Sequence, residues 1–450
     1  MYTIFSVDDH IVEPPHVWSA RVPAKFRDRA PHVIEEDGRE FWVYEDERIL
    51  TMGLNAVAGR PRDQWDMEPA RFSDMIPGCY DPAERARDLL SQGVLASVAF
   101  PTLPRFGGML FTSFADKELA DACVRAWNDF ILEEWCPGGP PGLFVPMVIC
   151  QAWDPHLAAA EVRRCAALGA RALCFTENPV VDGLPSFHDP DGHWDPLFAA
   201  CEETGLAVCM HIGSSGWVPI VDPGAPFTST ISAATAGGQL AMTNMLLSPI
   251  PVRFPGIKLV WSEAGIGWVP ALLERADRQV ERHSGWAGEL PLKPSEIFAR
   301  NMWCCMVEEP IGLTLYELIG VDRILAETDY PHADTPYPNT QKAYAEVFAG
   351  LPDDVVQAVS HGNAEQLFDW TMADESLLTS PDVETWRASL VADPFAAMNR
   401  RHDVDGVEHG HTEVKPGDPC PEMVPDGALI VRCARPVRAD GTCEAGHRAW

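Results

Sequence analysis

The chain has 450 residues, of which 46% are hydrophobic and 22% are charged, so we expect a large buried core and exclude disorder of the whole chain. Its 34 basic and 66 acidic residues give a formal net charge of −32, which repels phosphate backbones and anionic lipids and argues against nucleic-acid binding. The 13 cysteines are spread thinly along the chain, with no basic leader and no apolar run of about 18 residues, so we expect a cytoplasmic protein with reduced thiols and no membrane span.

Short apolar runs rich in β-branched residues recur along the chain, and each is followed by a polar loop and then by helical apolar spacing. This rhythm predicts repeated strand–helix units. We place eight strands at residues 3–7, 95–101, 143–149, 170–175, 206–212, 257–261, 302–307 and 323–328. Eight parallel strands with intervening helices predict a (β/α)8 TIM barrel over about residues 1–370.

Two of the intervening helices have clear end signals. In residues 154–170, Asp154 caps the predicted helix, Pro155 opens its first turn and Gly169 ends it. Residues 193–206 repeat the pattern, with Asp-Pro at the start and Gly205 at the end. Two such units in succession favour an α/β fold over an all-β fold.

Two segments are expected to lie outside the regular strand–helix repeats of the barrel. About 80 residues separate the first two strands, far more than a usual connection, so we expect an insertion over about residues 13–90. Its residues 32–44 contain a Glu-Asp-Gly turn signal between alternating runs, which predicts a β-hairpin. After residue 370 the rhythm is lost, and we expect residues 371–450 to form an extension that packs on a partner subunit, as in a homodimer.

The reactive groups of such barrels project from the C-terminal ends of the strands, and here those ends are polar. The polar residues there are Asp8 and His10 on the first strand, Glu177 on the fourth, His211 on the fifth, Glu263 on the sixth, Glu308 on the seventh, and Asp329 on the eighth, with His332 just beyond.

Asp8 and His10 lie two residues apart in an extended segment, so both side chains point to the same side and can share one cation. His211 and Asp329 come from strands that lie across the barrel, and they supply two further ligands. Imidazole and carboxylate donors suit zinc, iron or manganese. The sequence therefore predicts a divalent metal site at the mouth of the barrel.

Five motifs resemble the amidohydrolase-related family, whose members include enzymes like aminocarboxymuconate-semialdehyde decarboxylase. The motifs are VDDHIVEP, CMHIGSSG, LVWSEAGIGWVP, ETDYPHADTPYP and GNAEQLF, and they fall between about residues 3 and 370. The resemblance implies a barrel with a catalytic divalent metal and assigns the ligand role to Asp8, His10, His211 and Asp329.

The chain departs from this family at two positions. Many relatives have histidine or glutamate where Asp8 stands, and the decarboxylase has a histidine where Glu263 stands. Two-metal amidohydrolases also bridge their ions with a carboxylated lysine or a glutamate at the fourth strand, the place of Glu177. With Glu263 and His332, Glu177 offers donors for a second ion; the alternative is that the glutamates support the histidines or bind substrate. One ion and two ions per chain remain open.

Three further residues are candidates for contact with a small-molecule substrate. His332 is a proton donor or a metal ligand, with a purely structural role as the alternative. Arg105 and Trp217 lie in the loops after the second and fifth strands, where they are candidates to bind an anionic and an apolar part of a substrate. Serine-nucleophile, phosphate-loop and dinucleotide signatures are missing from the sequence.

The leading hypothesis for the reaction is metal-assisted hydrolysis of a C–N, C–O or C–C bond, with Asp329 or Glu263 as the base. A second is oxygen chemistry, because the family includes non-haem diiron monooxygenases that hydroxylate bulky lipophilic substrates. A third is non-oxidative decarboxylation or hydration, as in other relatives. The remaining alternative is a barrel that binds a ligand without catalysis.

Overall fold

The computed structural model describes most of the chain in backbone and side chains. The residues outside this description are 37, 50–52, 63–64, 66–70, 223, 287–289, 394–422, 427–428 and 433–450. For the short antiparallel strands β13 (Met423–Asp426) and β14 (Leu429–Arg432) only the backbone is described. Apart from these two strands, the predicted 371–450 extension lies outside the described residues after Asp393.

The predicted eight strands form the wall of a parallel barrel. They are β1 (Ile4–Ile11), β5 (Val94–Pro101), β6 (Phe144–Val145) with β7 (Met147–Val148), β8 (Ala172–Phe175), β9 (Ala207–His211), β10 (Lys258–Ser262), β11 (Met302–Met306) and β12 (Ile324–Ala326). Hydrogen bonds join them in chain order, with one interruption at Pro146 between β6 and β7, where a proline has no N–H to donate.

The seam between the first and last strands is closed by backbone hydrogen bonds just beyond β12. Asp329 N donates to Asp8 O over 2.8 Å, and His10 N donates to Tyr330 O over 2.8 Å. These bonds place the residues after β12 beside the end of β1. The predicted (β/α)8 fold is confirmed.

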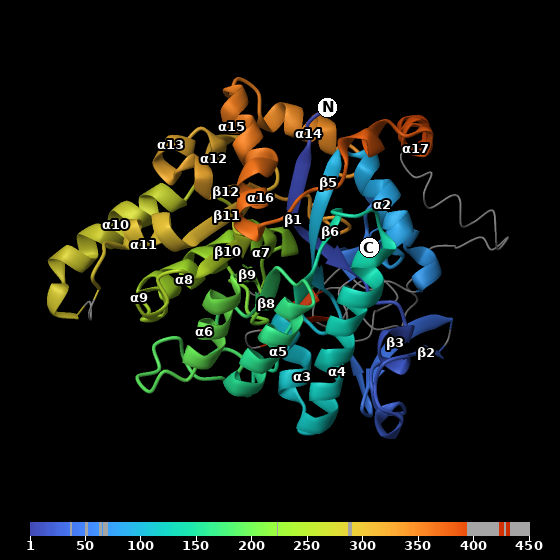
Figure 1. Cartoon of the computed structure of the whole chain (residues 1–450), viewed down its shortest axis with the longest axis horizontal. Helices are drawn as coiled ribbons and strands as arrows, with labels where there is room; N and C mark the ends of the chain where they lie inside the picture. Colours follow the sequence, from blue (N-terminus) through green and yellow to red (C-terminus); the bar gives the residue numbers. More distant parts are fainter. Residues whose placement is uncertain are drawn as a thin grey trace.

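Helices surround the strands (Figure 1). The longer ones are α2 (Pro82–Ser91), α4 (Lys117–Phe130), α5 (Pro155–Ala167), α6 (Asp195–Thr204), α8 (Thr235–Leu246), α10 (Val269–Arg282), α11 (Pro294–Asn301), α14 (Thr340–Val347) and α17 (Pro381–Ala392). The shorter ones are α1 (His16–Ser19), α3 (Met109–Ser113), α7 (Phe227–Ala233), α9 (Ile250–Arg253), α12 (Pro310–Leu313), α13 (Tyr316–Ile319), α15 (Asp353–Gln357) and α16 (Asn363–Phe368). No helix among the described residues is long and apolar enough to cross a bilayer.

The two helices with clear end signals differ at their starts. Asp154 caps α5 as predicted, because its carboxylate accepts bonds from His156 N and Leu157 N. Asp195 instead occupies the first turn of α6 and pairs with Arg253 at 2.9 Å, so it caps nothing. Both helices have a glycine of positive φ just beyond their ends, as C-terminal caps require.

The residues between β1 and β5 contain an antiparallel sheet of β2 (His32–Glu36), β3 (Arg39–Tyr44) and β4 (Glu47–Ile49). Trp42 of β3 is buried and meets Trp18 of α1 edge-on, with ring centroids 5.4 Å apart. Tyr44 packs in the same way on Phe111 of α3 at 5.4 Å. In Figure 1 β2 and β3 lie on the opposite side of the molecule from α10 and α11. Helix α2 follows this sheet in the chain and precedes β5.

Candidate metal centre

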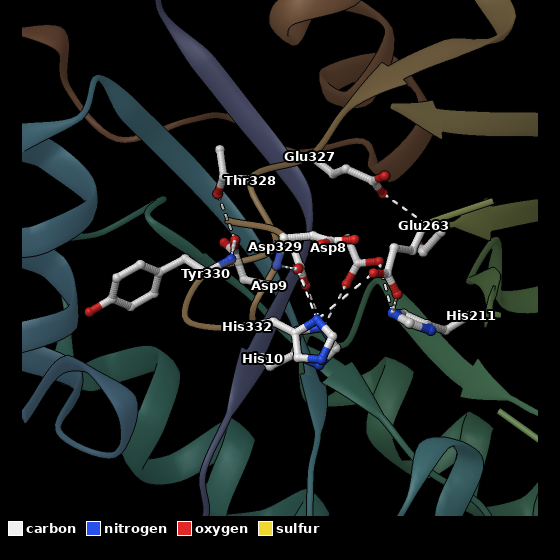
Figure 2. A network of polar contacts seen from close by, with 12 residues as sticks. Asp8, Asp9, His10, His211, Glu263, Glu327, Thr328, Asp329, Tyr330 and His332 are labelled. Atoms are coloured by element: carbon white, nitrogen blue, oxygen red, sulfur yellow. Dashed lines mark hydrogen bonds and ion pairs between the residues drawn. The ribbon is translucent and has the colours of Figure 1, made fainter. Parts of the chain in front are cut away.

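Three consecutive residues of β1 divide between two sides of the strand. Asp8 and His10 are buried and point towards the middle of the barrel mouth, while Asp9 points the other way (Figure 2), as strand alternation requires. The Asp9 carboxylate accepts hydrogen bonds from Thr328 Oγ1 at 2.6 Å, from Tyr330 N at 3.0 Å and from the Ser97 hydroxyl. Asp9 therefore ties β1 to β5 and to the segment after β12.

Three other strands bring polar side chains to the same place. Asp329, after β12, has Oδ1 2.9 Å from His10 Nε2. His211, at the end of β9, has Nε2 3.4 Å from Asp8 Oδ2 and 3.2 Å from Oε2 of Glu263, which follows β10. Asp8 Oδ1 itself lies 3.6 Å from His10 Nε2. Asp8, His10, His211, Glu263 and Asp329 are thus brought together (Figure 2).

Two donor sets within this cluster have the spacing of a metal site. One consists of Asp8, His10 and His211, and the other of His10, Asp329 and His332; in each, one ligand atom per residue lies within 4.8 Å of the others. His332 Nδ1 is 2.9 Å from Asp329 Oδ2 and 3.8 Å from Glu263 Oε1. Because His10 belongs to both sets, the arrangement has room for one ion or for two neighbouring ions.

Several buried atoms of the cluster make no hydrogen bond of regular geometry to the described residues, although His10 Nε2 and Asp329 Oδ1 lie 2.9 Å apart. They are both carboxylate oxygens of Asp8, both ring nitrogens of His10, His211 Nε2 and Asp329 Oδ1. Buried polar atoms normally have partners, because desolvation without a hydrogen bond is costly. His211 Nδ1 lies 2.6 Å from Ile212 O, which fixes the tautomer and leaves Nε2 as a free electron-pair donor. These residues fit a divalent cation.

Burial and mutual repulsion shape the electrostatics of the cluster. Burial raises the pKa of Asp8 well above its ordinary value, and Glu327, Asp329 and Glu263 raise it further. Burial likewise raises the pKa of Glu263. Burial lowers the pKa of His10 and brings that of His211 to about 3, so both imidazoles are neutral, as metal ligation requires.

Asp329 and His332 form an oppositely charged pair within this cluster. Burial opposes the charged form of each, but the attraction and hydrogen bond between them outweigh it. The pKa of Asp329 is lowered, with His10 adding to the effect, and that of His332 is raised to about 9. A buried carboxylate that stays ionised thus lies beside an imidazolium.

Two of the acidic residues have left-handed backbones. Glu263 has a φ of 53° and Asp329 a φ of 49°, a region that non-glycine residues seldom adopt. Hydrogen bonds hold both of them, from Glu263 N to Glu327 Oε2 at 3.1 Å and from Asp329 N to Asp8 O at 2.8 Å. Such strained backbone gathers at functional sites, where the surrounding structure fixes it.

Glu177, Arg105 and Trp217 lie outside both donor sets. The Glu177 carboxylate accepts hydrogen bonds from the Ser214 hydroxyl, from Ser215 N at 2.6 Å and from Ser215 Oγ at 2.8 Å. Both of its oxygens are therefore engaged by the loop after β9. Arg105 is exposed in the loop after β5, and Trp217 is half-buried in the loop after β9.

Two residues that the sequence reasoning did not single out adjoin the cluster. Glu327 is buried, its Oε2 accepts a hydrogen bond from Glu263 N, and burial raises the pKa of its carboxyl. Its position at the end of the predicted eighth strand was a usable signal. Phe106 stacks on the His211 ring at 4.3 Å and 12° and meets the His10 ring edge-on at 5.7 Å. No sequence signal marks Phe106, because its role depends on the path of a loop.

The sequence profile described as amidohydrolase matches residues 16–370. No curated protein sequence matches the chain. Solved structures of similar fold include the following three. An amidohydrolase from Mycobacterium avium subsp. paratuberculosis is 22% identical with a TM-score of 0.63, over 82% of this chain and 99% of that chain. The 5-carboxyvanillate decarboxylase from Sphingomonas paucimobilis is 24% identical with a TM-score of 0.58, over 82% of this chain and 100% of that chain. The 5-carboxyvanillate decarboxylase from Novosphingobium aromaticivorans is 15% identical with a TM-score of 0.56, over 82% of this chain and 96% of that chain. That structure is complexed with manganese and 4-hydroxy-3-methoxy-5-nitrobenzoic acid.

Proposed function

The chain belongs to the amidohydrolase family, and we propose that it is a hydrolase whose divalent metal is held by Asp8, His10, His211 and Asp329. The observation that carries the proposal is the group of buried, unpartnered ligand atoms on these four residues. Nitrogen and oxygen donors of this kind suit zinc, iron or manganese. The family assignment by itself makes the protein a metal-dependent enzyme. Hydrolysis as its reaction is what we propose here in addition.

Hydrolysis needs an acceptor for a proton of water and a donor for the leaving group. A bound divalent ion supplies a water of lowered pKa and a Lewis acid for the scissile bond. Asp329 is the proposed acceptor, because its lowered pKa keeps it ionised. His332 is the proposed donor, since its raised pKa keeps it protonated and its Nδ1 lies 2.9 Å from Asp329. Groups whose pKa values are pushed apart in this way are typical acid and base pairs.

Glu263 has a third role in this proposal. Its carboxyl lies 3.2 Å from His211 Nε2 and 3.8 Å from His332 Nδ1, and burial raises its pKa. A protonated Glu263 donates a hydrogen bond to substrate, and an ionised one joins the metal ligands. Arg105 and Trp217, from neighbouring loops, remain the proposed contacts to an anionic and an apolar part of a small organic substrate.

Non-oxidative decarboxylation is the second candidate. It needs a proton donor to the carbon that loses carbon dioxide, and protonated His332 beside Glu263 provides one. The solved structures of similar fold include 5-carboxyvanillate decarboxylases, among them one complexed with manganese. The same cluster thus suits cleavage of a C–C bond without water as the nucleophile.

A third candidate, oxygenation by a pair of irons, is favoured by the two donor sets that share His10. Elemental analysis and an oxygen-uptake assay separate it from the others, because it requires two irons per chain and substrate-dependent oxygen uptake.

Turnover of a substrate panel by metal-loaded protein tests the main proposal. We expect hydrolysis of an amide, lactone or 1,3-dicarbonyl, with incorporation of ¹⁸O from labelled water into the product. Release of carbon dioxide from aromatic acids, with no hydrolysis in the panel, replaces hydrolysis by decarboxylation. A fully metal-loaded protein that turns over neither class contradicts both.

A further inference from the structure

Arg85 is a fully buried arginine on α2, in the insertion between β1 and β5. Its guanidinium donates hydrogen bonds to backbone carbonyl oxygens. Nε donates to Gly78 O at 2.5 Å, Nη1 to Tyr330 O at 3.4 Å, and Nη2 to His10 O. Burying a cation is costly unless its donors are satisfied, and here the carbonyl dipoles satisfy them.

Two of these carbonyls belong to the seam that forms the metal centre. His10 is a proposed ligand, and Tyr330 directly follows the ligand Asp329. Tyr330 O already accepts the bond from His10 N at 2.8 Å, so the guanidinium joins the ends of β1 and of the segment after β12 at one point. A planar guanidinium with five donors is suited to such bridging, whereas a lysine ammonium lacks the fork.

The Tyr330 side chain is also held by α2. The Arg85 guanidinium carbon lies 4.6 Å from the centroid of the Tyr330 ring. It also lies 5.3 Å from the centroid of the Trp135 ring. Tyr330 Oη donates to Asp88 Oδ2 at 2.7 Å, one helical turn after Arg85. The ring therefore points away from the carboxylate cluster towards α2 (Figure 2), and the backbone of Asp329 and Tyr330 is fixed from that side.

We propose that Arg85 is a positioning residue of the metal centre, which holds the ligands His10 and Asp329 in register across the seam between β1 and β12. This role rests on the proposed metal centre. It assigns a function to the insertion, because the residue that aligns the two sides of the site comes from α2 and not from a barrel strand.

The structure offers a matched control. Arg387 of α17 is half-buried and, like Arg85, donates to backbone carbonyls, to Ser91 O at 2.9 Å and to Leu378 O at 2.9 Å. Among the described residues its hydrogen bonds go to the end of α2 and to Leu378, and none goes to β1 or to the segment after β12. Arg85→Met and Arg387→Met therefore remove the same chemistry at two places, of which only the first touches the site.

The test combines two measurements on the full chain. The first is amide hydrogen exchange of peptides covering residues 8–13 and 327–334 in chelator-treated protein, with residues 207–211 as the internal reference. We expect exchange to be roughly tenfold faster in both segments for Arg85→Met and unchanged for Arg387→Met, because lost hydrogen bonds lower the local opening free energy. The second is Mn²⁺ affinity by competition with a fluorescent chelator. We expect Arg85→Met to bind Mn²⁺ roughly 10–100-fold more weakly.

Unchanged exchange in both segments overturns the proposal, as does an Mn²⁺ affinity equal to that of Arg387→Met. Faster exchange of the reference peptide to the same extent also overturns it, because that result indicates a general loss of stability. If Arg85→Met does not fold, Arg85→Lys is judged by the same criteria. A wild-type protein that binds neither Mn²⁺ nor Zn²⁺ refutes the proposed metal centre, while the exchange comparison still decides whether Arg85 holds the seam.

Discussion

We expect replacement of Asp8 by asparagine to stabilise the metal-free protein and to weaken the stabilisation that a bound metal provides. Both Asp8 oxygens are buried and have no hydrogen-bond partner among the described residues, and the nearest imidazoles, of His10 and His211, are neutral because their pKa values are lowered. In metal-free protein an ionised Asp8 is therefore unsatisfied and repelled by Glu327, Asp329 and Glu263. A buried unsatisfied polar group costs about 1–3 kcal/mol. We expect metal-free Asp8→Asn to be more stable than wild type by roughly this amount at pH 8.

The pH dependence follows from the raised pKa. In the unfolded chain Asp8 ionises near its ordinary pKa of 3.8, whereas in the folded protein it holds its proton to higher pH. At this group the unfolded state thus binds fewer protons above pH 4, so the contribution of Asp8 to wild-type stability falls as pH rises. The advantage of Asp8→Asn is absent below pH 4 and grows above it.

Metal opposes this advantage by about 2.3 kcal/mol. An ion at 100 times its Kd stabilises the wild type by about 2.7 kcal/mol, and at the same concentration a variant that binds a hundredfold more weakly gains only about 0.4 kcal/mol. Urea unfolding with chelator and with Mn²⁺, at pH 4 and at pH 8, measures the free energy of unfolding of each protein under these four conditions. Asp9→Asn is the control: Asp9 is equally buried but accepts several hydrogen bonds, so its replacement destabilises both forms. A metal-free Asp8→Asn less stable than wild type at pH 8 refutes the reasoning.

Three further predictions concern the same cluster. His332→Gln should lower kcat by roughly 10²–10⁴-fold while metal content measured by elemental analysis stays unchanged; a loss of metal instead makes His332 a ligand. Glu177→Gln should leave the number of ions per chain unchanged, because Ser214 and Ser215 already engage both oxygens; loss of one of two ions would restore Glu177 as a bridging ligand. Exhaustive chelation should abolish turnover and lower the unfolding temperature, and both should return on addition of Mn²⁺ or Zn²⁺; full activity without metal contradicts the proposed centre.

The barrel could be predicted because its signals are local. Each of the eight strands is a short apolar run between turn signals, and Asp154 with Gly169 marks a helix at both ends. The approach of Asp8 to His10 also follows from strand alternation alone. The start of α6 at Asp195 was predicted but its cap was not, since the Asp195 side chain pairs with Arg253, 58 residues away in the sequence, and a local pattern cannot show long-range pairing.

The surroundings of the cluster depend on loop paths, which the sequence does not specify. Phe106 stacks on His211 only because the loop after β5 turns back across the barrel mouth. Glu327 and Asp329 are two residues apart after the same strand, but which of them adjoins His10 depends on the left-handed backbone at Asp329. Arg85 lies about 75 residues from His10 in the chain, and its contact with the seam requires α2 to lie beside the end of β1.

The claim that Asp8, His10, His211 and Asp329 hold a catalytic metal is tested most directly by anomalous diffraction from crystals of protein loaded with Mn²⁺ or Zn²⁺. The account predicts an anomalous peak within coordination distance of these four side chains, and its loss in the His10→Ala, His211→Ala double variant. A peak elsewhere, or none among these residues in fully loaded crystals, contradicts it.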